Sequence, residues 1–447
     1  MSRQRRLWSS STVSRLADAR VTTASSTDRR RVLWLTAEGV SLTGDNIFYV
    51  ALSWTVVDAH GAGSLAWVLT AGALPRGLLM LLGGAVVDRV GPLRLAVLSD
   101  ISRALVLGAI TAAVWVLGTP LALLVALAAV FGVADALYYP ASGALPSLLV
   151  PASHVVRVQN VRNLLSRTGL VVGPIVGGLL VSRTGPELPF LADAATFLLC
   201  AVALAACRPA AGLGVAPAAK PTPPEKGDST SLLDELRGGF SYITHRPALA
   251  TPLLAAALFE FAINGVINVG YPAIAASSGW GSAGFGFLSA GMGVGAGVSA
   301  LLLSIVPRLA VAHRVYIAAA AAAAAALITV AHAGNVATAA AASAILGVAA
   351  GAVAGVIFPL LQHGTDRNHI GRVMSMFYFL TAGLAPLSLA AIAAIINAAD
   401  PPVGLTCAAA AAVGAGLVGY LGSRPTIGRH EAAAATERPS KTTSAHR

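Results

Sequence analysis

The chain has 447 residues and a formal net charge of +11, yet only 11% of its residues are charged and 56% are hydrophobic. Soluble domains typically contain about 25% charged residues, so this chain has roughly half of the charge that keeps a protein in water. Its three cysteines lie in apolar runs and match no metal or redox spacing, which excludes a disulfide-stabilised secreted scaffold. The composition predicts a polytopic membrane protein.

The chain contains twelve stretches that are apolar and long enough to cross a bilayer. A bilayer core of ~30 Å requires about 20 residues of helix. The stretches lie at residues 32–58, 64–87, 94–118, 120–149, 163–182, 188–207, 248–276, 284–306, 315–333, 336–362, 373–398 and 402–422. We therefore predict an all-α membrane protein with twelve transmembrane helices.

The spacing of these stretches predicts two bundles joined by a long linker. The first six-helix bundle covers residues 32–207 and the second covers 248–422. The linker, 208–247, is rich in Pro and Ala and ends in an amphipathic stretch that we expect to form an interfacial helix. Residues 1–31 and 423–447 are expected to be disordered, basic cytoplasmic tails.

The positions of the basic residues predict the orientation in the membrane. Segments on the same side as the two termini contain 27 of the 30 Lys and Arg residues. Positive charge concentrates on the cytoplasmic side, so both termini are expected to be cytoplasmic. This asymmetry also explains the basic net charge without a nucleic-acid partner.

The two predicted bundles contain matching landmarks, which indicates an internal repeat. Three pairs recur at offsets of 214, 213 and 212 residues, namely Arg94 with Arg308, Pro146 with Pro359, and Pro174 with Pro386. The repeat supports two parallel six-helix bundles. Transporters with this layout bind their substrate between the halves and alternate access by rocking.

The predicted loop between the second and third helices contains a motif, GGAVVDRVGPLR, from Gly83 to Arg94. It resembles the signature loop of the major facilitator superfamily. The matching positions are Gly84, Asp88, Arg89, Gly91 and Arg94. Pro92 and Leu93 replace part of the basic run that the family pattern has there. The alternative is an ordinary tight loop with positive charge on its inner side.

The fifth predicted helix contains GLVVGPIVGG, from Gly169 to Gly178. This stretch resembles the core of the antiporter motif of the same superfamily. The matching positions are Gly169, Gly173, Pro174, Gly177 and Gly178. Small residues let membrane helices pack closely, so a purely structural role is the alternative. A further glycine of the full motif would fall at Asn160, so the match is partial.

Other stretches resemble one branch of that superfamily, the bacterial drug:proton antiporters that include macrolide and enterobactin exporters. They include SLTGDNIFYVALSW, YYPASGALPSLLVP and GRVMSMFYFLTAGLAPL. The resemblance implies a monomeric protein of the bacterial cytoplasmic membrane that moves a small molecule with the proton gradient and needs no cofactor. One departure is Asp135, because many carriers have a buried arginine in that helix.

Ionisable residues at membrane depth are costly and are functional candidates by default. Asp45 lies 16 residues before Gly61, the centre of an outer loop, and Arg76 lies 15 after it. Similar depth on adjacent helices predicts an Asp45–Arg76 ion pair. The same counting about Thr119 predicts a second pair.

That second pair is Arg103 with Asp135, and Asp100 is expected to compete for Arg103 because it lies one helical turn away. In the second half Glu260 has no basic residue in its span, and Asn264 follows on the same face. We predict Asp45 or Glu260 as the proton carrier.

The proton-coupling or substrate-binding candidates also include Asp135, Glu38, Arg76, Arg103 and Asn264. Glu38 lies only ~9 Å inside the membrane by the helical rise, so contact with the interface is the alternative for this residue. Asp193 lies near the outer end of the sixth helix, where we expect an interfacial cap. The resemblance and the carboxylates at membrane depth together favour an exporter of a hydrophobic or amphipathic compound. A siderophore or metabolite carrier of the same fold, exporting or importing, is the alternative.

Two other classes of function are disfavoured. An intramembrane enzyme would need a catalytic dyad or a metal site within the spans, and the sequence contains neither pattern. A sensor with a transporter fold would be favoured by a loss of coupling carboxylates, but several are present. The glycine-rich GMGVGAG at Gly291–Gly297 lacks the strand that a dinucleotide loop requires and predicts helix packing instead.

Overall fold

The computed structural model describes residues 10–207, 241–244, 246–305, 312–366 and 369–436. Within these ranges every regular element is helical. The first half comprises α1 (Ser10–Val90), α2 (Pro92–Leu117), α3 (Leu121–Leu149), α4 (Ala152–Thr184) and α5 (Glu187–Ala206). The second half comprises α7 (Pro247–Gly265), η1 (Val266–Gly270), α8 (Tyr271–Ser277), α9 (Gly281–Ile305), α10 (Ala312–Ala331), α11 (Val336–His363), α12 (Ile370–Ala398) and α13 (Pro401–Thr436).

The long helix α1 is two helical segments separated by a kink at Gly61. This residue has φ 80° and ψ 173°, a conformation that glycine adopts readily because it has no side chain. The kink confirms the predicted turn between the first two spans. The predicted turn near Thr119 is confirmed too, because α2 ends at Leu117 and α3 begins at Leu121.

Nine helices in the described ranges are long and apolar enough to cross a membrane. The remaining three of the twelve predicted spans fall on α1 and α12. Spans 32–58 and 64–87 are the two segments of α1, and 373–398 belongs to α12, whose apolar part is the shorter stretch Gly383–Ala398. The chain is therefore a multi-span helical protein.

The helices α1 and α13 extend into the two predicted tails. The helix α1 begins at Ser10, and no glycine or proline precedes Gly39 to interrupt it. The helix α13 continues to Thr436 through an alanine run, the residue with the highest helix propensity. Residues 1–9, 437–447 and nearly all of the predicted interfacial helix lie outside the described residues.

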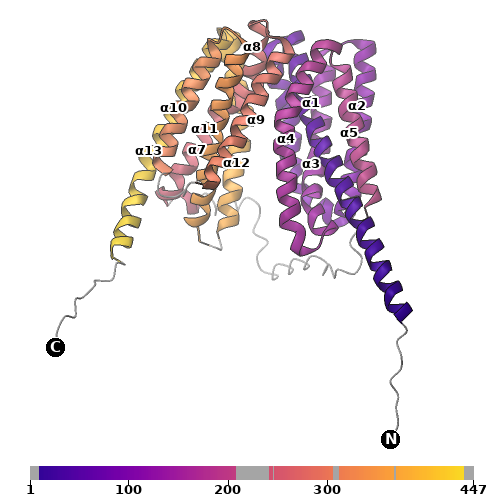
Figure 1. Cartoon of the computed structure of the whole chain (residues 1–447). Coiled ribbons are helices and arrows are strands. Elements are labelled where there is room, and N and C mark those ends of the chain that lie inside the picture. The colour runs from indigo at the N-terminus through magenta and orange to yellow at the C-terminus, as the bar shows by residue number, and fades with distance from the viewer. Residues whose placement is uncertain (1–9, 208–240, 245, 306–311, 367–368, 437–447) are drawn as a thin grey trace, which may run out of the picture.

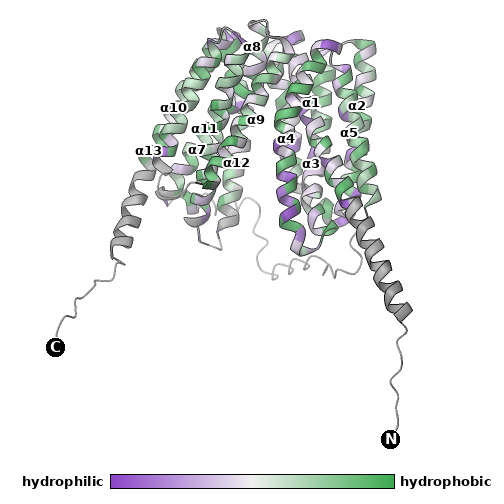
Figure 2. Cartoon of the chain, viewed as in Figure 1, coloured by the Kyte–Doolittle hydropathy of each residue, from purple (hydrophilic) through white to green (hydrophobic). Residues whose placement is uncertain are grey.

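The helices form two groups that lie side by side, α1–α5 and α7–α13 (Figure 1). The start of α1 and the end of α13 lie at the same end of the molecule (Figure 1). The two groups meet mainly through α4 against α9 and α1 against α12 and α8. Hydrophobic residues cover much of the outer surface of both groups (Figure 2), as expected for helices that face lipid.

Candidate functional site

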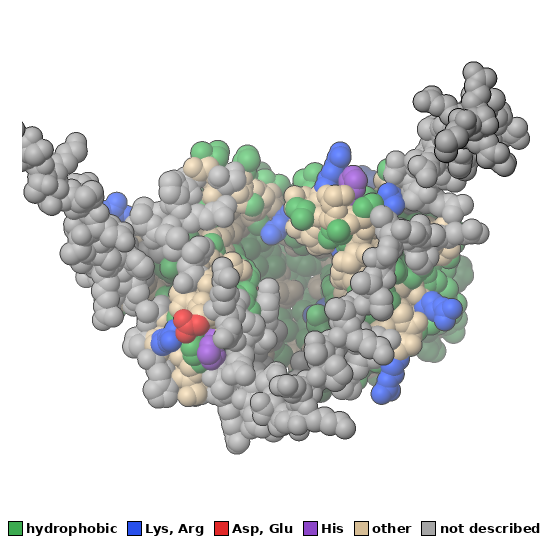
Figure 3. Space-filling view, turned by 90° about the horizontal axis from the view of Figure 1, so that it is seen from below, with side chains coloured by type: hydrophobic (Ala, Val, Ile, Leu, Met, Phe, Trp, Pro, Cys, Tyr) green, Lys and Arg blue, Asp and Glu red, His purple; other side chains and the backbone are tan. Residues whose placement is uncertain are grey.

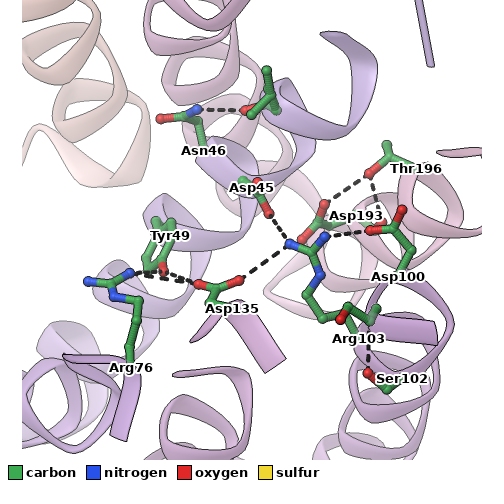
Figure 4. A network of polar contacts seen from close by, with 12 residues as sticks. Asp45, Asn46, Tyr49, Arg76, Asp100, Ser102, Arg103, Asp135, Asp193 and Thr196 are labelled. Carbon is green, nitrogen blue, oxygen red and sulfur yellow. Dashed lines mark hydrogen bonds and ion pairs between the residues drawn. The ribbon is translucent and has the colours of Figure 1, made fainter. Parts of the chain in front are cut away.

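A network of charged side chains lies inside the first group of helices, with Arg103 of α2 at its centre (Figure 4). Arg103 is 1% exposed. Its guanidinium lies 3.3 Å from Asp135 of α3 and 3.7 Å from Asp45 of α1, and it donates a hydrogen bond to Asp100. The network thus connects α1, α2 and α3 within the membrane-spanning region.

Aromatic rings hold the same guanidinium from both sides. The ring of Tyr138 lies 3.9 Å from the Arg103 Cζ, and the ring of Phe197 lies 4.1 Å from it. Cation–π contacts are strongest where water is excluded, as it is around this residue. Arg103 is therefore fixed by packing as well as by its carboxylate partners.

Asp135 links this buried centre to Arg76, which is partly exposed. The hydroxyl of Tyr49 donates a hydrogen bond to Asp135 Oδ2 at 3.3 Å, and Arg76 Nη1 donates one to Tyr49 Oη at 3.1 Å. Arg76 Nη1 also lies 3.7 Å from Asp135 Oδ2, with 36% of its side chain exposed. A chain of polar contacts therefore runs from Arg76 through Asp135 to Arg103.

The predicted Asp45–Arg76 ion pair is wrong. Asp45 contacts Arg103, whereas Arg76 contacts Asp135 and Tyr49. Counting residues from a turn gives the depth of a side chain but not the direction in which it points around its helix. The predicted Arg103–Asp135 pair and the competition from Asp100 are confirmed.

Asp193 of α5 also belongs to the network, so the expectation of an interfacial cap is wrong. It is 0% exposed, and its Oδ1 accepts a hydrogen bond of 3.0 Å from Thr196. Asp193 lies six residues into α5, or ~9 Å along the helix. That depth was visible in the sequence, but its burial against Gly44 of α1 was not.

Glu38 is buried, not interfacial, and forms a separate ion pair. It is 1% exposed, and Arg162 of α4 donates to it from Nε and from Nη2, the latter at 2.5 Å. Ser142 of α3 donates a further hydrogen bond of 3.2 Å to Glu38 Oε1. This pair ties α4 to α1 and α3 and is distinct from the contacts of Arg103.

A cavity of about 260 Å³ lies between the two groups of helices, slightly below the usual ~300–1,000 Å³ of small-molecule sites. Phe48, Leu52 and Phe131 contribute to its apolar wall. Tyr49 and Arg76 line it from the first half, so the polar network reaches the cavity through them. Seen from the end at which α1 begins, the molecule is hollowed between the two groups (Figure 3).

The second half contributes Asn264 of α7 and Asn268 of the π-helical turn η1 to the cavity wall. Asn268 Nδ2 donates a hydrogen bond of 2.9 Å to the backbone oxygen of Asn264. Such π-turns often mark functional sites, and nothing in the sequence pattern indicated this one. Glu260 lies one turn from Asn264, and no described Lys or Arg lies within 4 Å of its carboxylate. Glu260 and the Arg103 network are thus in different halves.

The glycines of the motif in α4 have two packing faces. Gly169 and Gly173 pack against the backbone of α1 at Leu42 and Thr43, and Gly177 packs at Ile47. On the other face, Gly178 lies against α9, where Ser282 Oγ donates a hydrogen bond of 2.9 Å to its backbone oxygen.

Pro174 contacts the second half as well. Its backbone oxygen lies where a side chain on Gly286 of α9 would be. Gly291 and Gly295 pack on α11, which agrees with the predicted packing role of the glycine run. The two faces of α4 therefore join the helix that carries Asp45 to the other half.

The loop motif between α1 and α2 is described only in part. Gly91 has φ 90° and precedes α2, as a tight glycine turn requires. Arg89 and Arg94 are both exposed. The surroundings of Gly84 and of the Asp88 side chain lie outside what the structure describes.

No group of three His, Cys, Asp or Glu in the described ranges is arranged to hold a metal ion. The polar centre consists instead of acids, arginines and a tyrosine beside a cavity. Such an arrangement can bind and release protons and can respond to a molecule in the cavity through Arg76 and Tyr49.

Comparisons with known proteins identify the family of this chain. The model of the Major Facilitator Superfamily matches residues 35–390. An uncharacterised transporter of this type from Bacillus subtilis, YfiS, is 27% identical over 231 residues, covering 51% of this chain and 52% of that protein. The multidrug efflux pump Tap of Mycolicibacterium fortuitum is 22% identical over 364 residues, covering 80% and 86%.

A solved structure supports the fold. A bacterial homologue of the iron transporter ferroportin, in an inward-facing state, superposes with a TM-score of 0.65 at 14% identity, covering 88% of this chain and 98% of that one. At such low identity the similarity concerns the fold alone. From the family match over most of its length, this chain belongs to the Major Facilitator Superfamily of membrane transporters.

Proposed function

We propose that this protein is a proton-coupled exporter of a hydrophobic or amphipathic small molecule. The observation that carries the proposal is a buried acid–arginine network that reaches a cavity between the two halves through Arg76 and Tyr49. The similarity to a multidrug efflux pump points in the same direction. The protein would act as a monomer without a cofactor and without catalysing a chemical reaction.

The proposed topology has twelve spans in two parallel six-helix bundles, with both termini in the cytoplasm and the protein in the bacterial cytoplasmic membrane. The distribution of positive charges supports this topology, and so does the position of the start of α1 and the end of α13 at the same end of the molecule (Figure 1). In this orientation the hollow in Figure 3 faces the cytoplasm, and the contact between α4 and α9 closes the outer side. The substrate would enter from inside, and rocking of the halves would expose it outside.

Coupling requires that protons and substrate act on the same residues. Asp45 and Asp135 both lie near the guanidinium of Arg103, so protonation of either would change how the other is held. A molecule in the cavity contacts Arg76 and Tyr49, and both of these side chains interact with Oδ2 of Asp135. Occupancy of the cavity and the protonation of the network are thereby connected.

The experiment compares wild type with Asp45→Asn in an efflux-deficient bacterial host. We expect wild type to lower the accumulation of dyes and antibiotics from a panel, and a protonophore to abolish this effect. Asp45→Asn should lose the proton-dependent part because the amide neither binds nor releases a proton at neutral pH. Asp58→Asn, at an exposed position of α1, is the matched control, and membrane levels of each variant are measured.

Full proton-dependent efflux by Asp45→Asn would remove this residue from the coupling mechanism. The second candidate function is a carrier of a siderophore or another polar metabolite. Its specific support is the modest cavity volume together with four polar side chains in the wall, Tyr49, Arg76, Asn264 and Asn268. Unchanged accumulation of every compound in the panel, with the protein present in the membrane, would favour this second function.

A further inference from the structure

The buried network of the first half contains more acids than bases. Four carboxylates share two arginines: Asp45, Asp100, Asp135 and Asp193, with Arg103 and Arg76. If all four were ionised, four negative and two positive charges would leave a net charge of −2. Uncompensated charge is costly at membrane depth, and neighbouring carboxylates avoid simultaneous ionisation. Protons must therefore reside on this network.

Two of the four carboxylates are well supported as anions. Asp100 accepts a hydrogen bond from Arg103 one turn further along α2. Asp135 accepts hydrogen bonds from Arg103 Nη1 and from Tyr49 Oη, and it lies near Arg76 as well. Each of them has a donor that favours the ionised form. The protons are then left to Asp45 and Asp193.

Asp193 has the environment of a neutral carboxylic acid. Its Oδ2 is buried and has no hydrogen-bond partner among the described residues. No described Lys or Arg lies within the 4 Å of an ion pair. Within the part of the chain that the structure describes, the one side-chain hydrogen bond that Asp193 accepts comes from the uncharged hydroxyl of Thr196.

Asp193 also lies beside Asp45, across the surface of α1. Its Oδ1 is so close to Gly44 that a side chain there would overlap it, and Asp45 is the next residue. The carboxylate of Asp45 lies 3.7 Å from the guanidinium of Arg103, whereas that of Asp193 lies on the same side of the network beyond ion-pair distance (Figure 4). The charged groups that act on Asp193 from the neighbouring helices are Asp45 on α1, Arg103 on α2 and Asp135 on α3, with Asp100 bound to the same arginine.

We propose that Asp193 is a second proton-binding carboxylate, which exchanges its proton with Asp45 during the transport cycle. The inference rests on the proton coupling proposed above. Asp45 is the entry point because 18% of its side chain is exposed, whereas Asp193 is closed off. When one of the two protons has left the network, the remaining proton leaves the carboxyl group of Asp45 and binds the ionised carboxylate of Asp193. Asp45 is then ionised beside Arg103, and the total charge is unchanged.

The first test is infrared spectroscopy of the purified full-length protein, which requires no substrate. Protonated carboxylic acids have a carbonyl stretching band that ionised ones lack. At neutral pH we expect this band in wild type, reduced intensity in Asp193→Asn, and no change in Asp58→Asn. Undiminished intensity in a folded Asp193→Asn variant would overturn the proposal.

Thr196→Val keeps the carboxyl group of Asp193 and is the alternative variant for the infrared test if Asp193→Asn does not fold. It removes the hydrogen bond to Asp193 Oδ1, so the carbonyl band should move to higher frequency. A band that does not move would show that the protonated acid lies elsewhere, which would also overturn the proposal.

The second test addresses the route of the proton. On transfer to D₂O the band shifts as the acidic proton is exchanged, and we expect Asp45→Asn to slow this shift several-fold while Asp58→Asn leaves it unchanged. An unchanged rate in Asp45→Asn would overturn the exchange through Asp45.

Ethidium efflux by the same variants separates this inference from the proposed function. Proton-dependent ethidium efflux that is lost in Asp45→Asn but complete in Asp193→Asn would overturn only the role of Asp193. Efflux that no protonophore affects, in any variant, would instead count against proton coupling itself.

Discussion

At the scale of single residues, Arg103 organises the candidate site. It contacts three carboxylates and two aromatic rings, and no part of it is left to solvent. A buried ion pair adds little net stability, but removal of one partner leaves an unpaired charge. The arginine is therefore required once the carboxylates are present.

We expect Arg103→Met to destabilise the protein by roughly 3–5 kcal/mol at neutral pH, because its carboxylates lose their buried cation. The loss should be smaller at mildly acidic pH, where the carboxylates can take up protons. Thermal unfolding in detergent at the two pH values measures this. Arg183→Met, at an exposed position of α4, should be neutral, and an equal loss at both pH values would contradict the argument.

A second residue-scale prediction concerns Asp366, in the connection between α11 and α12. Hydrogen bonds from Tyr242 and Arg246 lower the pKa of Asp366 from its ordinary value of 3.8. A carboxylate with a lowered pKa stabilises the fold above its ordinary pKa, and this contribution is lost as the pH falls through the lowered one.

The melting temperature of wild type should therefore exceed that of Asp366→Asn slightly at pH 7, and the difference should shrink as the pH falls below the ordinary pKa of 3.8 and vanish only below the lowered pKa. The effect is small because 63% of the Asp366 side chain is exposed, so solvent screens its interactions. Asp58→Asn, at an exposed position of α1, serves as the control. A difference that grows as the pH falls would contradict the prediction.

At the scale of elements, α4 connects the two halves. Three of its glycines let α1 approach closely, and Gly178 with Pro174 does the same for α9. A side chain on Gly173 or Gly178 would overlap backbone atoms, which have no rotamers with which to move aside, and one on Gly169 or Gly177 would be in tight contact with backbone. The small residues therefore permit close contact between α4 and α9, at the end of the molecule opposite to the start of α1 and the end of α13 (Figure 1).

We expect Gly286→Leu to prevent this contact, because its side chain would meet the backbone oxygen of Pro174. Overpacking costs about 1–3 kcal/mol, enough to shift a conformational equilibrium roughly tenfold. Transport should fall, and a cysteine introduced by Ser282→Cys, now 2% exposed, should become reactive from outside. Gly297→Leu on the same helix has open space and is the matched control.

If Gly286→Leu left the outer side closed and transport intact, the contact between α4 and α9 would have no gating role. The same element-scale logic applies to the start of α1. Helices continue where no residue interrupts them, so α1 extends back to Ser10, although its first part lacks the apolar composition of a span.

At the scale of the whole molecule, the cavity lies where the two halves meet. Its polar residues come from α1 in one half and from α7 and η1 in the other. Relative motion of the halves must therefore change the site itself. The direction from which the cavity is reached is a property of the assembled molecule.

We expect Asn268→Cys to react with a membrane-impermeant thiol reagent in inside-out vesicles but not in intact cells, since the hollow faces the end at which the described chain begins (Figure 3). The variant is made with Cys407→Ser, because Cys407 is exposed whereas Cys200 and Cys207 are buried. Substrate should slow the labelling. Reaction only from the cell exterior would contradict the proposed orientation.

The sequence predicted some contacts of the site and missed others for one reason. Helical spacing placed Arg103 near Asp135 and Asp100 correctly. It failed for Asp45 with Arg76 and for Asp193, because depth along a helix does not specify the rotation of that helix relative to its neighbours. The π-turn at Asn268 likewise has no counterpart in the apolar pattern.

The sequence alone determined the class of protein, the boundaries of most helices and the residues able to carry charge inside a membrane. These properties depend on composition and local spacing, which hydrophobic burial and helical geometry convert directly into structure. Only the tertiary structure decided which acid meets which arginine, that Asp193 joins them, and that Arg76 and Tyr49 connect them to the cavity. Such contacts depend on the packing of residues far apart in the chain, where a rotation of one helix exchanges one partner for another.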